Sequence, residues 1–186
     1  MFTIGITKGR WNTLVTSLQQ FRDDFENDVS LCRALPDFVV RHAQYRDMSL
    51  RELCMAIHDT YHQNDVARLT MAMYSSLPVP AMIPADAYAK IAHAEVEHLD
   101  IELCEGRVAA SLLTPYPPGI PLLVPGERFN WAIVQFLRFS RTFNERFPGF
   151  ETDIHGLTQR VADSGVRFYV DCLLGEGGSQ DEGEPR

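Results

Sequence analysis

The sequence predicts an α+β fold, in which mixed helices accompany a small, mostly antiparallel sheet. Some segments carry apolar residues at the three- and four-residue spacing of an amphipathic helix, and others are short and rich in strand-forming residues. The two kinds do not alternate as regular β–α–β units, which argues against a doubly wound parallel sheet. The 186 residues are 45% hydrophobic and 23% charged, as in one ordinary globular domain.

The amino-terminal part predicts a strand followed by an amphipathic helix. The run FTIGI alternates apolar and small residues, as a short strand does, and Gly5 interrupts it. A helix is predicted from Thr7 to about Asn27, because its apolar residues share one face: Trp11, Leu14, Val15, Leu18, Phe21 and Phe25. Residues 29–48, with Pro36 in the middle, follow as an irregular connection.

Capping signals place the next helices. Ser49 and Glu52 form a capping box, in which the serine hydroxyl and the glutamate carboxylate satisfy helix-start amides reciprocally. That helix runs through His62, and others are predicted at 65–74, 84–93 and 130–146, the last two starting at Pro84 and Asn130. Strands are predicted at 96–99, 107–113, 120–124, 150–155 and 166–173, the last two around a turn at 162–165.

Composition narrows the class of partner. Seventeen Lys and Arg residues against 25 Asp and Glu leave a net charge of −8, which argues against nucleic acid or an anionic membrane surface as partner. No apolar run reaches the roughly 18 residues of a membrane helix, and the start shows no secretion signal. The four cysteines have no CxxC spacing, so we expect a reducing, cytoplasmic setting.

The last residues, 175–186, predict a disordered acidic tail. Three of the first four are glycine, and the segment contains no aliphatic or aromatic residue. Such a segment cannot bury enough apolar surface to offset the entropy lost on ordering.

Two histidines four residues apart suggest a metal site. His58 and His62 share one face of the predicted helix and could bind one metal ion, as in HExxH proteases. Asp59 replaces the glutamate that would act as base, and its shorter side chain would leave the attacking water out of reach. We therefore favour surface histidines, with a metal hydrolase as the alternative.

The most unusual segment is TPYPPGIPLLVPGE, residues 114–127. Five prolines within 14 residues restrict its backbone, and two glycines permit positive φ. One interpretation is the wall of a pocket or an interface, for which Tyr116, Pro118, Gly119 and Glu127 are candidate residues. We favour the alternative, a structural crossover packed against a sheet edge.

A second candidate lies in PGFETDIHG, residues 148–156. Asp153 and His155 are two residues apart on a predicted strand, so their side chains share a face and can meet. A carboxylate that orients an imidazole is the arrangement of a general base, but the chain has no GxSxG nucleophile run. We favour a polar pair that fixes a turn or an interface.

Taken in order, these runs resemble the C-terminal part of the bacterial arginine/lysine/ornithine decarboxylases, which are pyridoxal-phosphate enzymes of fold type I. TPYPPGIPLLVPGE and PGFETDIHG resemble two signature runs of that family's C-terminal domain. The order of FTIGITKGRWNTL, PAMIPADAY at 80–88 and EGRVAASLL at 105–113 also fits. The resemblance covers residues 1–174.

The resemblance implies that the large cofactor domain is missing. Residues 1–30 resemble a strand and helix left from the small cofactor subdomain, and residues 31–174 resemble the complete C-terminal domain. In the family, pyridoxal phosphate binds a lysine in a Ser-x-His-Lys context, which neither Lys8 nor Lys90 has. We therefore expect no cofactor in this chain alone and pyridoxal phosphate in the complete enzyme.

The family reaction is the loss of the α-carboxylate from a basic amino acid, with arginine or lysine favoured here and ornithine as a further option. Pyridoxal phosphate acts as the electron sink. The resemblance implies that the C-terminal domain flanks the active-site entrance and helps to assemble oligomers. Its expected partner is the rest of a decarboxylase or further copies, and the chain alone is not expected to catalyse. The alternative is a stand-alone regulatory or assembly module that binds a full-length decarboxylase.

Overall fold

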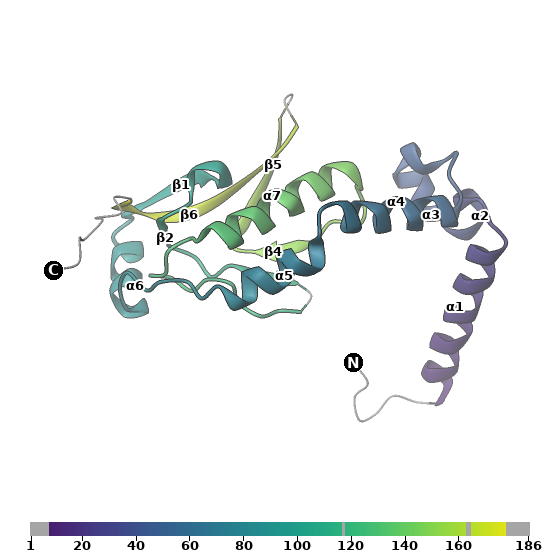
Figure 1. The fold of residues 1–186 in the computed structure, drawn as a ribbon, viewed down its shortest axis with the longest axis horizontal. Coiled ribbons are helices and arrows are strands. Elements are labelled where there is room, and N and C mark those ends of the chain that lie inside the picture. Colours follow the sequence, from purple (N-terminus) through teal and green to yellow (C-terminus); the bar gives the residue numbers. More distant parts are fainter. Residues whose placement is uncertain (1–7, 117, 163–164, 178–186) are drawn as a thin grey trace. The chain divides into compact units, whose positions relative to one another are not determined.

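The computed structural model describes residues 8–116, 118–162 and 165–177 (Figure 1), and by its contacts the chain divides after His62 into two compact units. The boundary predicted at residue 30 comes from the family resemblance rather than from contacts, and it stays a prediction. The strand predicted in FTIGI lies outside the described residues.

The first unit is helical. It contains α1 (Lys8–Glu26), α2 (Leu31–Ala34), α3 (Pro36–Arg41), the 3-10 helix η1 (Ala43–Tyr45) and α4 (Leu50–Gln63). The capping box is confirmed: the Ser49 N–H donates to Glu52 Oε2 at 2.8 Å, and the Glu52 N–H donates to Ser49 Oγ at 3.1 Å. The guanidinium of Arg51 donates to the Phe25 carbonyl at 3.0 Å and to the Glu26 carbonyl, so α4 satisfies the end of α1.

The irregular connection predicted for residues 29–48 is wrong. Most of this segment is helical, in α2, α3 and η1. Pro36 starts α3 at a position where its missing N–H costs nothing, so it does not break the structure.

The second unit builds a sheet around one long strand. Its elements are α5 (Val66–Ser75), α6 (Pro84–Ala92), β1 (Val96–Asp100), the 3-10 helix η2 (Ile101–Leu103), β2 (Arg107–Ala109), β3 (Thr114–Tyr116), α7 (Trp131–Arg146), β4 (Asp153–His155), β5 (Leu157–Ala162) and β6 (Gly165–Gly177). Strand β6 pairs with β1, β2 and β5, and β3 pairs with β4 in a separate ribbon. Every named pairing is antiparallel, which confirms the α+β class.

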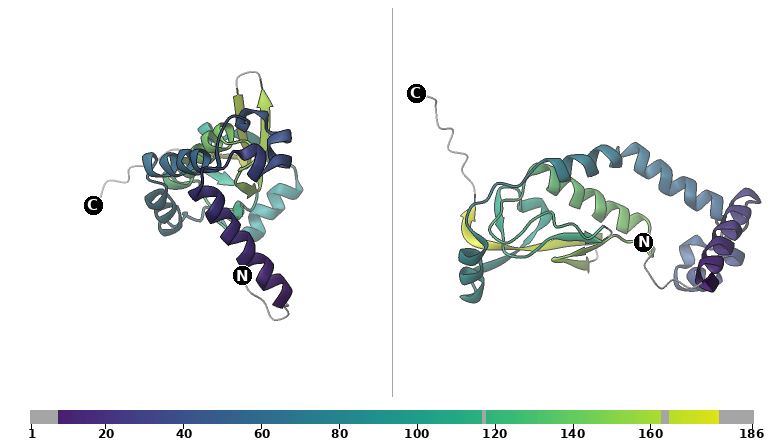
Figure 2. Two further views of the ribbon diagram at one scale, coloured as in Figure 1. Left: turned by 90° about the vertical axis from the view of Figure 1, so that its right-hand side faces the viewer. Right: turned by 90° about the horizontal axis from the view of Figure 1, so that it is seen from below.

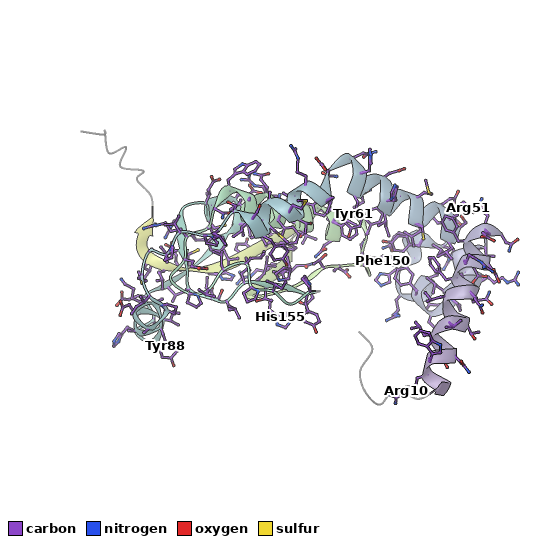
Figure 3. All side chains as sticks on the ribbon, turned by 60° about the horizontal axis from the view of Figure 1, so that its bottom comes forward. Arg10, Arg51, Tyr61, Tyr88, Phe150 and His155 are labelled. Atoms are coloured by element: carbon purple, nitrogen blue, oxygen red, sulfur yellow. The ribbon has the colours of Figure 1, made fainter. Side chains whose placement is uncertain are left out.

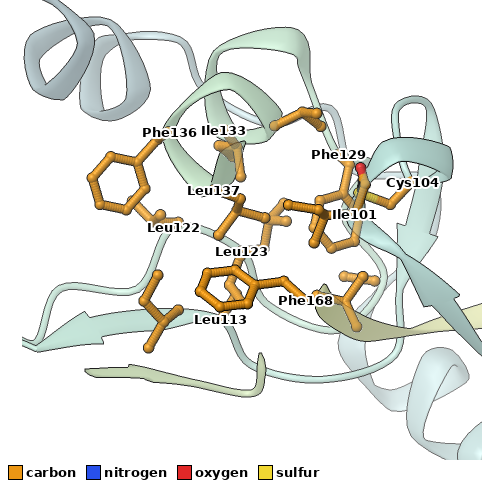
Figure 4. Close-up of a cluster of buried hydrophobic side chains, with 14 of the residues drawn as sticks. Ile101, Cys104, Leu113, Leu122, Leu123, Phe129, Ile133, Phe136, Leu137 and Phe168 are labelled. Carbon is orange, nitrogen blue, oxygen red and sulfur yellow. Dashed lines mark hydrogen bonds between the residues drawn. The ribbon is translucent and has the colours of Figure 1, made fainter. Parts of the chain in front are cut away.

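The core of the second unit lies between α7 and β6, and α7 runs along one face of the sheet (Figure 2). Asn130 caps α7 as predicted, because its Oδ1 accepts from the Ile133 N–H at 2.9 Å. Figure 4 shows the buried side chains that α7, β6 and the segments before α7 contribute, among them Ile133, Leu137 and Phe168.

Several predicted strands differ from the structure. Residues 120–124 form no strand and contribute only an isolated bridge between Leu113 and Leu123. Pro121 and Pro125 lack the N–H that a longer ladder needs. The strand predicted at 107–113 ends at Ala109. Three strands, β4, β5 and β6, are present where two closing strands were predicted, because Gly156, at φ +85°, separates β4 from β5.

The predicted disordered tail begins too early. Strand β6 continues to Gly177, and residues 178–186 lie outside the described residues. No helix in the described part of the chain is long and apolar enough to cross a membrane.

Truncation of Leu137 should destabilise the second unit. The side chain is fully buried in the α7–β6 core, and a Leu→Ala change in such a place removes transfer free energy and leaves a cavity. We expect Leu137→Ala to lower the free energy of unfolding by about 3 kcal/mol, measured by urea denaturation followed by circular dichroism. Leu77→Ala, at a position 82% exposed, is the control and should change it by less than about 0.5 kcal/mol.

The buried thiols should be inert in the folded chain. Burial raises the pKa of Cys104 to about 12 and that of Cys172 to about 11, so the reactive thiolate is scarce at pH 8. Exposed Cys32 is expected to react with a disulfide reagent at once, and Cys104 and Cys172 only after unfolding. Rapid labelling of Cys104 in the native chain would contradict the described core.

Candidate functional site

The β3–β4 ribbon carries three of the six predicted site residues, Tyr116, Asp153 and His155, on one surface, and a fourth, Gly119, lies beside Tyr116. Its register pairs Thr114 with His155, Pro115 with Ile154 and Tyr116 with Asp153. Pro115 and Ile154 are buried, so the alternation of a strand turns Tyr116, Asp153 and His155 to the opposite face. We call these three residues the ribbon face.

The ring of Tyr116 is held by the proline-rich turn that follows β3. The Gly119 N–H donates to the Pro115 carbonyl at 2.9 Å, which closes the turn. Gly119 has φ +82°, and a Cβ atom there would lie 2.9 Å from Tyr116 Cε2. Glycine is therefore required both by the backbone conformation and by the ring packed against it.

Asp153 and His155 form a pair on the ribbon face, as predicted from their spacing. His155 Nε2 lies 3.3 Å from Asp153 Oδ2, and the ring centroids of His155 and Tyr116 are 6.2 Å apart. All three side chains are largely exposed, with Tyr116 at 60%, and Figure 3 labels His155 at the surface of the second unit. The ribbon face is an open surface rather than a closed catalytic pocket.

The two remaining predicted residues take different places. Pro118 is exposed in the turn before Gly119. The carboxylate of Glu127 accepts from the Val124 N–H at 2.8 Å, and its backbone bridges to Pro80. The contacts of Glu127 therefore shape a second turn, and none of those given for it is with the ribbon face.

A groove between α5 and α7 was not predicted from the sequence. It has a volume of about 500 Å³, and its walls include Arg68 and Leu69 from α5 and Trp131, Gln135 and Arg138 from α7. Arg68 pairs with Asp65 at 2.8 Å and Arg138 with Glu102 at 2.6 Å, so both guanidinium charges are balanced. The exposed Trp131 at the start of α7 was the one available signal, because the two walls lie about 60 residues apart in sequence.

The described residues offer no third ligand for the metal site considered at His58 and His62. The rings of His58 and His62 have centroids 6.5 Å apart on α4, and both residues are exposed. Among the described residues, no group of three His, Cys, Asp or Glu side chains could hold a metal ion.

The lysines that the structure describes do not fit a pyridoxal-phosphate site. Lys90 Nζ lies 3.5 Å from Glu95 Oε2 at the end of α6, and Lys90 is not among the lining residues of the α5–α7 groove. The side chain of Lys8 lies outside the described residues. We therefore derive no chemical step through that cofactor for this chain.

Comparisons with known proteins show which protein family this chain resembles. The family model for "Orn/Lys/Arg decarboxylase, C-terminal domain" matches residues 67–174. The chain is 44% identical over 177 residues to "Lysine decarboxylase LdcA" of Pseudomonas aeruginosa, covering 93% of this chain and 24% of that protein. It is 34% identical to the "Biodegradative arginine decarboxylase" of Escherichia coli, covering 84% of this chain and 21% of that protein.

Comparison with solved structures points to the same family. The structure of lysine decarboxylase A from Pseudomonas aeruginosa matches with a TM-score of 0.85 at 43% identity, covering 93% of this chain and 24% of that one. The constitutive lysine decarboxylase of Escherichia coli matches with a TM-score of 0.82 at 33% identity over the same shares. The chain thus spans about a quarter of the length of the curated relatives it matches.

Gly119→Ala should displace the Tyr116 ring. Both Gly119→Ala and the control Gly106→Ala place a side chain at positive φ, and each should cost about 1 kcal/mol of stability. A Cβ at Gly106 meets nothing within 4 Å, whereas one at Gly119 meets the Tyr116 ring. Aromatic NMR signals of Tyr116 and His155 are therefore expected to shift only in Gly119→Ala, and an unchanged spectrum would show that the turn does not hold the ring.

Proposed function

Because the chain belongs to the Orn/Lys/Arg decarboxylase family, through the C-terminal domain of these proteins, we propose that it is the C-terminal portion of a pyridoxal-phosphate-dependent basic amino acid decarboxylase. Lysine is the favoured substrate, since several of the most similar relatives are named as lysine decarboxylases. The single observation that carries the proposal is a match over nearly the whole chain to about a quarter of such proteins.

The chain is not catalytically competent by itself in this proposal. The described lysine, Lys90, is held by a carboxylate and is not among the lining residues of the α5–α7 groove. The reacting centre therefore belongs to the rest of a decarboxylase, which the relatives contain and which makes up about three quarters of their length. The free cysteines among the described residues suit a cytoplasmic enzyme.

The first contribution of the chain is assembly, through α1. Leu14, Leu18 and Phe21 lie on one side of this helix and are 40%, 60% and 50% exposed. Beside them, a hollow of about 510 Å³ is lined by α1 residues, by Ala34 and Leu35, and by Leu50. A row of exposed apolar side chains on one helix face is typical of a surface that another protein part covers. We assign that role to the rest of the decarboxylase.

The second contribution is active-site access, through the ribbon face. Tyr116, Asp153 and His155 form a rigid polar and aromatic surface without a closed cavity. Such a surface suits one wall of an entrance whose opposite wall comes from another part of the enzyme. The resemblance of residues 114–127 and 148–156 to signature runs of the family supports this placement.

A stand-alone regulatory or assembly module is the alternative. The exposed α1 face would serve that role equally well, because it requires only a partner with an apolar surface. The two proposals differ in the partner. A C-terminal portion of the enzyme would complete a decarboxylase that lacks this part, whereas a regulatory module would bind a decarboxylase that is already complete.

Removal of the apolar side chains from α1 should weaken binding to the rest of the enzyme. The partner for this test is the lysine decarboxylase of Pseudomonas aeruginosa, shortened by the quarter that matches this chain. Changing Leu14, Leu18 and Phe21 together to Gln is expected to lower the affinity at least about a hundredfold, because about 1–2 kcal/mol of apolar burial is lost with each side chain. Calorimetry or analytical ultracentrifugation measures the change.

The matched control changes Val40, Met55 and Met71 to Gln, since these exposed apolar residues lie on different helices and form no stripe. Its affinity should equal that of the unchanged chain. Equal loss in both triple variants would refute a specific α1 surface. Equally tight binding to the full-length and the shortened enzyme would favour the regulatory module.

A further inference from the structure

We propose that Asp153 and the ring of Tyr116 receive the ammonium group of a primary alkylamine, the group that ends a lysine side chain. The inference deepens the proposed function and rests on it for the identity of the amine. It adds an attachment point on this chain at the entrance of the active site, in addition to the contacts made by the reacting centre.

The register of the ribbon brings the two groups together. Tyr116 and Asp153 are direct cross-strand partners in the antiparallel β3–β4 pair, so their Cβ atoms lie about 5 Å apart on the same side. The buried pair of Pro115 and Ile154 anchors the other side of the ribbon in the core. The carboxylate and the ring are therefore placed by the backbone before any ligand arrives.

The charge of Asp153 is available to a cation. Its side chain is 73% exposed, and among the described residues it is paired with no lysine or arginine; its neighbour at 3.3 Å is the imidazole of His155. Glu102 shows the contrast, because the guanidinium groups of Arg138 and Arg141 hold its two oxygens at 2.6 Å and 2.8 Å. A carboxylate without a permanent cationic partner can accept an ammonium group without first breaking an ion pair.

The Tyr116 ring supplies the second half of the recognition. Its face attracts a cation through the ring quadrupole, and its edge offers apolar surface to an alkyl chain. Gly119 lies close against the ring, because a Cβ atom at this position would be 2.9 Å from Tyr116 Cε2. A carboxylate next to a fixed aromatic ring favours an alkylammonium over a neutral alkyl alcohol of the same length.

The test is an NMR titration of the full chain with 1,5-diaminopentane, with 1-pentanol as the uncharged probe. Because the face is open to water, where ion pairs are weak, we expect millimolar affinity. The diamine should produce saturable shifts of the Tyr116 and His155 ring signals, and 1-pentanol should not. Asp153→Asn and Tyr116→Leu should each weaken binding about three- to tenfold.

Asp59→Asn is the matched control, because it removes one exposed carboxylate from α4, away from any ribbon residue in sequence. It should leave the affinity unchanged, and backbone spectra show whether each variant is folded. The proposal is overturned by equal shifts with both probes, or by unchanged diamine affinity in folded Asp153→Asn. These outcomes are independent of whether the chain binds the shortened decarboxylase, so failure of one proposal is distinguishable from failure of the other.

Discussion

The packing of α7 against β6 is the constraint on which the second unit depends. Ile133, Val134 and Leu137 come from α7, and Phe168 and Val170 come from β6, and all are buried in one cluster. The helix also positions the ribbon. Buried Asn144 accepts from the Thr152 N–H at 3.1 Å, one residue before Asp153, and Ile154 joins the same cluster. The position of the exposed ribbon face is thus set by the α7–β6 core, which β4 contacts through its buried side.

The longer helices, α1, α4, α5, α6 and α7, could be predicted because their signals are local, whereas the short helices within residues 29–48 were missed. The capping box at Ser49, the cap at Asn130 and Pro84 at a first helical position each depend on side chains within one turn of the helix start. Asp65 shows the limit of this reasoning. It occupies the N-cap position of α5 as expected, but its carboxylate pairs with Arg68 instead of accepting from a helix-start amide.

Features set by distant residues could not be predicted. Residues 120–124 have strand-like composition, but Leu123 makes only one bridge, to Leu113, within a proline-rich crossover. The α5–α7 groove is lined by residues about 60 positions apart in the sequence, and no local sequence pattern predicts it. For the ribbon, the sequence showed that Asp153 and His155 share a face. That Tyr116 lies opposite Asp153 follows from strand pairing, which the residues alone do not specify.

The fold and the comparisons together describe a chain whose surfaces suit a larger protein. The apolar side of α1 and the polar ribbon face offer different chemistry, and the proposed function assigns the first to burial against another protein part and the second to the entrance. Under the proposed function, the α7–β6 core supports the ribbon face and the reacting groups belong to the rest of the enzyme.

The most direct measurement is release of carbon dioxide from lysine by the shortened Pseudomonas aeruginosa lysine decarboxylase, with pyridoxal phosphate, in the presence and absence of this chain. Our account predicts no release by either polypeptide alone and restored release on mixing, saturating at equal molar amounts. Release by this chain alone, or no release from a mixture that demonstrably forms a complex, would contradict the account.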